Sequence, residues 1–316
     1  MIRTAPPTST QVLLHADDFG MNPAVNQGII AGFSHGVLTS TSILANAPEF
    51  TDAVTRWWWL DGERAAGRIA SADIRQSLGD RCASPFDLGV HLNLTEGTPL
   101  TADFPAECRD TSGRFPGLGV MARRLLLTPR RWRPAIQREL SAQVARVVDA
   151  GLRPTHLNGH QYVELFPALA EPIIDIAARF RIPVVRVACE RGVWRAMVLA
   201  RLASRWRGRS RRASLCSADE YHGTAHAGRV SLDLMRRWTS GLPEGCTLEV
   251  GLHPGLAPAA PSVDGWRDPL GALRPRELEL LQSPELRDLL AAGGLHLGRI
   301  RSLTRASLTP HGRRAA

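Results

Sequence analysis

The sequence predicts an α/β protein with a barrel or near-barrel of about seven β/α units in a single domain. Short apolar runs rich in β-branched residues alternate with helical patterns along the chain, which favours strands joined by crossover helices. With 316 residues, 44% of them hydrophobic, the chain can bury one large core. An open, doubly wound sheet is the alternative architecture.

The strands and helices follow one another in regular order. The first strand contains Val12-Leu13-Leu14, and Pro134 and Gly151 suit the first turn and the end of one later helix. We expect strands at 11–16, 41–46, 87–93, 154–158, 183–188, 247–252 and 295–299. Helical patterns fall at about 23–35, 49–59, 134–150, 165–180, 192–206, 230–240 and 275–292.

Three stretches interrupt this alternation within the single domain 1–316. Residues 97–130 break the rhythm with proline and glycine and are expected to be an insertion. Residues 207–229 and 302–316 are expected to be loop or tail. Neither an internal repeat nor a domain linker is found.

The net charge of +9 is carried by arginine alone, since the sequence contains no lysine. Such a charge suits an acidic partner, but uniform arginine usage with abundant alanine, glycine and proline more simply reflects genome composition. No recognised nucleic-acid motif accompanies the arginines, so no nucleic-acid partner is expected. The five cysteines form no C-x-x-C pair, and the chain shows neither a signal-peptide pattern nor an apolar run of roughly 20 residues. We therefore expect a cytoplasmic protein.

Polar side chains recur where the strands end. In a β/α barrel these ends converge on one mouth, and Asp and His there can hold a divalent cation with positions open to water. The residues concerned are Asp17, Asp18, His91, His156, His160 and His253.

Each of these residues also has a structural interpretation. The two aspartates could cap the next helix, whose N-terminus favours negative charge. A lone histidine such as His91 is more often a hydrogen-bonded core residue, and His253 before Pro-Gly could belong to a turn. Their comparable positions in the alternation favour a shared site.

Four blocks in this order, "ADDFGMNPAVNQGI", "GVHLNLTEGTPL", "PTHLNGHQ" and "LEVGLHPG", span residues 11–255. They resemble the YdjC-like carbohydrate deacetylases, a family that includes chitooligosaccharide and hopanoid-associated deacetylases. The resemblance implies a distorted TIM-like (β/α) barrel and metal-dependent hydrolysis of an N-acetyl group on a sugar. It also implies one divalent metal ion, magnesium or zinc, of undetermined identity.

The resemblance implies roles for individual residues. Asp18, His91 and His160 match the metal ligands, Asp17 the general base and His253 the general acid, although the two aspartates could be exchanged. Substrate contacts are expected from Arg186, Glu190 and Tyr162, with an ordinary loop ion pair as the alternative for Arg186 and Glu190.

One block departs from the family pattern. Where the family commonly shows D-x-H-x-H-x-H, this chain has Asn158, His160, Tyr162 and Glu164. A three-ligand site is retained, but the orientation of the ligands and the contacts to substrate are affected.

The expected substrate is an N-acetylglucosamine-type sugar, either a chitooligosaccharide or a glycolipid such as a hopanoid. The basic stretch 192–212 is compatible with a peripheral helix at the inner membrane or with a barrel helix that buries one face. A homodimer is left open. The rival interpretations are a sugar- or glycolipid-binding protein with weakened activity and a metal-dependent glycoside or phosphoester hydrolase. A glycosidase would need two carboxylates across the cleft, for which Glu96 and Glu164 are the candidates.

Overall fold

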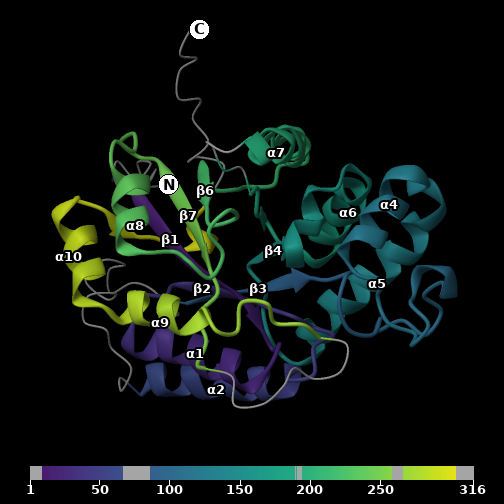
Figure 1. Ribbon diagram of the computed structural model, residues 1–316, viewed down its shortest axis with the longest axis horizontal. Coiled ribbons are helices and arrows are strands. Elements are labelled where there is room, and N and C mark those ends of the chain that lie inside the picture. Colours follow the sequence, from purple (N-terminus) through teal and green to yellow (C-terminus); the bar gives the residue numbers. More distant parts are fainter. Residues whose placement is uncertain (1–8, 67–85, 189, 191–193, 258–265, 304–316) are drawn as a thin grey trace, which may run out of the picture.

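The structure is a computed structural model that describes residues 9–66, 86–188, 190, 194–257 and 266–303. One parallel sheet curls around the centre of the molecule, in the order β5-β4-β3-β2-β1-β7-β6, and β8 pairs with the start of β1 (Figure 1). The strands are β1 (Gln11–Phe19), β2 (Ser40–Ile43), β3 (Asp87–Leu92), β4 (His156–Gly159), β5 (Val184–Val185), β6 (Glu220–His222), β7 (Thr247–Leu252) and β8 (His296–Leu297).

The barrel closes at a seam between β5 and the segment that leads into β6. Val184 forms an isolated parallel bridge with Cys216. Val185 N–H donates to the Cys216 carbonyl at 2.9 Å, and Cys216 N–H donates to the Pro183 carbonyl at 2.8 Å. Four residues later β6 pairs with β7 instead. The predicted distorted barrel is therefore confirmed, with an irregular wall on this side.

Helices surround the sheet. They are α1 (Pro23–His35), α2 (Phe50–Ala65), α4 (Leu118–Leu127), α5 (Pro129–Asp149), α6 (Ala170–Phe180), α7 (Trp194–Arg212), α8 (Leu232–Thr239), α9 (Arg274–Gln282) and α10 (Pro284–Ala292), with short 3₁₀ turns η1 (Ala106–Cys108), η2 (His160–Leu165), η3 (Pro167–Leu169) and η4 (Ile300–Ser302). None of the helices in the described part of the chain is long and apolar enough to cross a membrane.

Several predicted boundaries were wrong for local reasons. The helix expected from Pro134 begins at Pro129, which occupies its first turn, and Pro134 lies inside it. The helix expected over 275–292 is divided at Ser283, whose side chain caps α10 by accepting from Leu286 N–H. Residues 165–169 belong to 3₁₀ turns that precede α6.

The loop expected at 207–229 was wrong in part, because α7 continues to Arg212 and β6 occupies Glu220–His222. In β6 only Tyr221 is buried, between two half-buried polar neighbours, so three residues carry too little apolar pattern to indicate a strand. The stretch 97–130 contains η1 and α4 and no strand. Of the expected tail 302–316, residues beyond Leu303 lie outside the described part.

A polar layer inside the barrel supports the mouth. The ring of His15 lies 2.8 Å from Ser40 Oγ and 3.1 Å from Ser42 Oγ, and its centroid is 4.9 Å from that of His156. Gly89 makes room for the second ring, because a Cβ atom there would lie 2.3 Å from His156 Nε2. This layer lies next to the end of β1, where the candidate site begins.

Candidate active site

Asp17 and Asp18 both reach the barrel mouth because β1 is irregular at its end. Successive side chains of a regular strand point to opposite faces. Here the register with β2 shifts between Ala16 and Phe19, and Asp18 adopts a left-handed backbone with φ +72°. Such a bulge redirects a side chain, and aspartate tolerates this conformation better than most residues. Both carboxylates therefore lie near His91, at 3.8 and 3.6 Å.

Three of the predicted residues lie close enough together to hold a metal ion. Asp18 Oδ1 lies 3.1 Å from His160 Nδ1 and 3.6 Å from His91 Nε2. Each of the three residues offers one ligand atom, and these atoms lie within 4.8 Å of one another. His91 comes from β3 and His160 from the turn after β4, so the chain brings together residues up to 142 positions apart.

Asn158 and Ser42 fix the orientation of His91. His91 Nδ1 lies 2.9 Å from Asn158 Oδ1 and 3.2 Å from Ser42 Oγ. An amide oxygen accepts, so this contact places the proton on Nδ1 and leaves Nε2 free to face Asp18. Burial lowers the pKa of His91 to about 4 despite the neighbouring aspartates. The ring is thus neutral near pH 7, as a metal ligand must be.

Asp17 is held by a dense set of donors. Arg186 Nη1 donates to both of its carboxylate oxygens, at 2.7 and 2.9 Å, and Asn158 Nδ2 donates at 2.8 Å. Burial alone would raise the pKa of Asp17, but the charge of the Arg186 guanidinium holds it well below its ordinary value. The carboxylate is therefore ionised over the whole physiological range.

Asp18 and His160 form a charged pair. Burial opposes the ionisation of Asp18, yet Arg274, whose Nη2 donates to Oδ2 at 2.8 Å, and His160 hold its pKa well below the ordinary value. For His160, burial lowers the pKa, but Asp18 and Glu96 outweigh it and raise the pKa to about 9. A cation bound between these side chains would take the place of that proton.

His253 lies next to Asp17 at the mouth of the barrel. Its Nε2 is 3.9 Å from Asp17 Oδ2, and its Nδ1 has no hydrogen-bond partner among the described residues. Its backbone N–H donates to Glu277 Oε2 at 2.5 Å. The following loop packs tightly on α1: a Cβ atom at Gly28 would lie 2.3 Å from Gly255 Cα. The loop after β7 thus holds the ring at the mouth.

The three residues that the sequence predicts to contact substrate have different surroundings in the structure. Arg186 is 2% exposed, and its Nε donates to Glu249 Oε1 at 2.7 Å, so two carboxylates already occupy it. Glu190 accepts from Ala225 N–H at 3.0 Å and lies 3.7 and 3.5 Å from the rings of His222 and His226.

Tyr162, with φ +58°, lies with its hydroxyl 3.3 Å from that of Tyr221 on β6. Neither Tyr162 nor Glu190 has a described contact with the three-residue ligand set. The two candidates for a glycosidase pair have different surroundings: Glu96 lies 3.4 Å from His160 Nε2, and Glu164 lines a cavity under α7.

Sequence reasoning missed several groups in this site. Arg274 lies 256 positions from the carboxylate that it contacts, and Ser42, Glu249 and Glu277 gave no motif signal of their own. Charged residues inside apolar patterns, as in "TLEVGL" and "RELELL", were the one indication of such groups, because a charge that becomes buried requires a partner.

The sequence profile of the YdjC-like protein family matches residues 11–292. The chain belongs to this family. A "Carbohydrate deacetylase" of Geobacillus stearothermophilus is 35% identical over 172 residues, which cover 54% of this chain and 58% of that protein. A "Carbohydrate deacetylase" of Mus musculus is 29% identical over 315 residues, covering 91% of this chain and 93% of that protein.

Among solved structures, a candidate cellobiose-phosphate cleavage protein of Enterococcus faecalis superimposes with a TM-score of 0.64. It is 21% identical in sequence, and the match covers 93% of this chain and 98% of that one. At this level of identity the likeness concerns the fold alone, and it agrees with the barrel described above. The match to the Geobacillus protein, by contrast, spans less than two thirds of that relative.

Proposed function

We propose that this YdjC-like protein removes the N-acetyl group from an N-acetylglucosamine-type sugar with the help of one divalent cation. The observation that carries the proposal is the convergence of Asp18, His91 and His160 within 4.8 Å of one another, directly beside Asp17 and His253. The name carbohydrate deacetylase of the relatives supports the reaction class.

The ligand set fits a divalent cation. It supplies one carboxylate and two imidazoles, a donor set suited to Zn²⁺ and acceptable to other first-row divalent ions. His160 Nε2 is buried and makes no hydrogen bond among the described residues; its one given contact there is the ion pair with Glu96 at 3.4 Å. When bound, such an ion polarises an amide carbonyl and lowers the pKa of water. Magnesium and zinc both remain candidates for this ion.

Asp17 is proposed as the general base. It is ionised, buried and oriented by Arg186 and Asn158, and one of its oxygens faces His253. A carboxylate fixed in this way accepts a proton from the attacking water. In this proposal Arg186 positions Asp17, which replaces the sugar contact expected from the sequence.

His253 is proposed as the general acid. Its Nε2 points toward the same carboxylate that takes up the proton, at 3.9 Å, and its side chain is 11% exposed at the mouth. The departing amine nitrogen needs a proton because an unprotonated amide nitrogen is a poor leaving group. Asp17 and His253 would thus pass a proton from water to the leaving group.

The proposal also covers the contacts to the sugar and to the group attached to it. Tyr162 and Glu190, which follow β4 and β5, are proposed to contact the sugar at the mouth. For a glycolipid substrate such as a hopanoid, we propose that the basic stretch 192–212 contacts the inner membrane from the cytoplasmic side. A soluble chitooligosaccharide requires no such contact, and a homodimer is compatible with either substrate.

The test is release of free amine from N-acetylglucosaminyl oligosaccharides and glycolipids, measured with and without a chelator. Amine release that the chelator abolishes and added metal restores is the expected result. Release of reducing sugar without amine would instead indicate a glycosidase, and saturable ligand binding without turnover would indicate a binding protein. Either of these outcomes contradicts the proposed deacetylase.

A further inference from the structure

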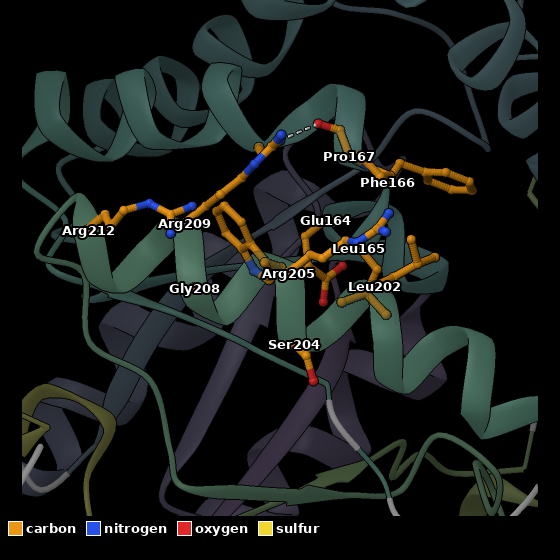
Figure 2. A pocket seen from close by; sticks show the side chains of 12 residues that line it. Glu164, Leu165, Phe166, Pro167, Leu202, Ser204, Arg205, Gly208, Arg209 and Arg212 are labelled. Carbon is orange, nitrogen blue, oxygen red and sulfur yellow. Dashed lines mark hydrogen bonds between the residues drawn. The ribbon is translucent and has the colours of Figure 1, made fainter. Parts of the chain in front are cut away.

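A cavity of about 400 Å³ lies between α7 and the η2–η3 turns (Figure 2). Three arginines from one face of α7, Arg205, Arg209 and Arg212, line one side, since residues three and four apart are neighbours on a helix. The other wall is Glu164–Pro167 with Ala170. Neither the Asp18–His91–His160 set nor Asp17 or His253 lines this cavity, although the charges of Arg186 and Asp17 act on Glu164.

One of these arginines is bound to the opposite wall, and the other two have guanidinium groups available for a ligand. Arg209 Nη1 donates to the Pro167 carbonyl at 3.0 Å and so ties α7 to the opposite wall. Within the described part of the chain, neither Arg205 nor Arg212 has a hydrogen-bonded or ion-paired partner, and both are exposed at the rim. An arginine fork matches the oxygens of a phosphate group better than those of a neutral ligand.

Glu164 supplies a second, independent observation. It lines the same cavity at 2% exposure. Apart from its own backbone amide, neither carboxyl oxygen has a hydrogen-bond partner in the described residues. A buried polar group without a partner is costly in a folded protein. A ligand hydroxyl in the cavity would satisfy it.

The charge on Glu164 does not oppose an anion. Burial, only partly offset by Arg186, raises its pKa to about 8, so the carboxyl is mostly neutral near pH 7. The cavity also exceeds a bare phosphate in size, and Leu165, Phe166 and Leu202 give it apolar surface. This combination suits a phosphate group that carries a small hydroxylated substituent.

We propose that this cavity binds a phosphate monoester, with Arg205 and Arg212 on the phosphate and Glu164 on a hydroxyl group of the ligand. The phosphate could come from a soluble metabolite or from a phospholipid headgroup, which present the same chemistry. None of the proposed metal ligands, the general base or the general acid lines this cavity, so phosphate binding can be tested apart from deacetylation.

The test is calorimetric titration of the full-length protein with glycerol 3-phosphate and with inorganic phosphate. We expect saturable binding that Arg205→Ala/Arg212→Ala weakens by about tenfold or more, because charge-assisted hydrogen bonds are lost. The matched control is Arg201→Ala/Arg211→Ala, which removes the same charge from exposed positions of the same helix and is expected to change affinity less than about twofold. Glu164→Gln should weaken glycerol 3-phosphate relative to inorganic phosphate.

Absence of saturable binding to the wild-type protein, or equal losses in the two double variants, would overturn the proposal. A second arm identifies the source of the phosphate: sedimentation with phosphatidylcholine vesicles, alone or mixed equally with phosphatidic acid. Sedimentation that requires phosphatidic acid and is lost only in Arg205→Ala/Arg212→Ala supports a headgroup. Binding of glycerol 3-phosphate without sedimentation supports a soluble ligand.

Discussion

Asn158 joins His91 to Asp17 through the two ends of one amide: its Oδ1 lies 2.9 Å from His91 Nδ1, and its Nδ2 donates to Asp17 Oδ1 at 2.8 Å. The family pattern commonly has aspartate at this position, and the substitution raised the question whether ligand orientation survives. The amide fulfils both tasks, because it accepts from the imidazole and donates to the carboxylate. A second carboxylate could not donate to Asp17 unless it were protonated.

Asn158→Ala should therefore weaken both metal binding and turnover. Loss of a group that orients a ligand typically costs about 10–100-fold in metal affinity. Metal affinity by competition with a chromogenic chelator measures this effect. Ser42→Ala is the graded comparison, since it keeps the amide but removes the 3.2 Å contact to His91 together with the Ser42 contacts to His15 and Asp17. A variant at Asn158 that binds metal as tightly as the wild type would contradict the proposed orientation.

Exchanging each aspartate for asparagine separates their roles. Asp17→Asn should reduce amine release by about 10²–10⁴-fold, the usual loss for a general base, and keep its metal. Asp18→Asn should lose the metal as well. Metal content by elemental analysis, beside the rate of amine release, distinguishes the two. If Asp17→Asn loses metal and Asp18→Asn retains it, the two assignments must be exchanged.

Arg186→Met should shift the pH dependence of turnover. The guanidinium holds the pKa of Asp17 well below its ordinary value, so its removal raises that pKa, and the acid limb of kcat/KM against pH moves to higher pH. Glu249→Gln is the control: it leaves the guanidinium beside Asp17 and should cause no upward shift. An acid limb that does not move in Arg186→Met would indicate a purely structural role.

Glu164→Gln should stabilise the protein at alkaline pH. The folded-state pKa of about 8 lies above the ordinary value of 4.5 for glutamate, so between these pH values the unfolded state binds fewer protons and wild-type stability falls as pH rises. Glutamine removes this slope. The melting temperature of the variant should exceed that of the wild type at pH 8, since 1 kcal/mol corresponds to roughly 2–4 °C in domains of about 150–250 residues. The two should converge below pH 5, and parallel pH profiles would show that Glu164 titrates normally.

The part of the site that the sequence predicted consists of residues at the ends of strong apolar strands. The polar residues at the strand ends could be grouped because parallel strands deliver their ends to one mouth, and the fold follows from the same alternation. The choice of Asp18, His91 and His160 as metal ligands came from the resemblance to the family. The register between strands, the backbone conformation of single residues and the ion pairs between distant residues could not be predicted from this alternation. The left-handed conformation of Asp18 depends on a shift against β2.

Arg186 shows the same limit for a single side chain. Its position after the fifth strand suggested a sugar contact, but that position does not reveal that two buried carboxylates meet its guanidinium. Likewise, β6 has one buried residue between two polar ones, and only its pairing with β7 makes it a strand. Tertiary partners, which a single sequence does not display, decide such cases.

Two backbone hydrogen bonds close the seam between β5 and Cys216 in the described part of the chain, and Arg186 is the first residue after β5. Arg186, the counter-ion of Asp17, therefore lies next to the irregular seam of the barrel. Warming should loosen that wall before the rest of the sheet gives way, so catalytic competence would fade at temperatures where most of the secondary structure is still intact.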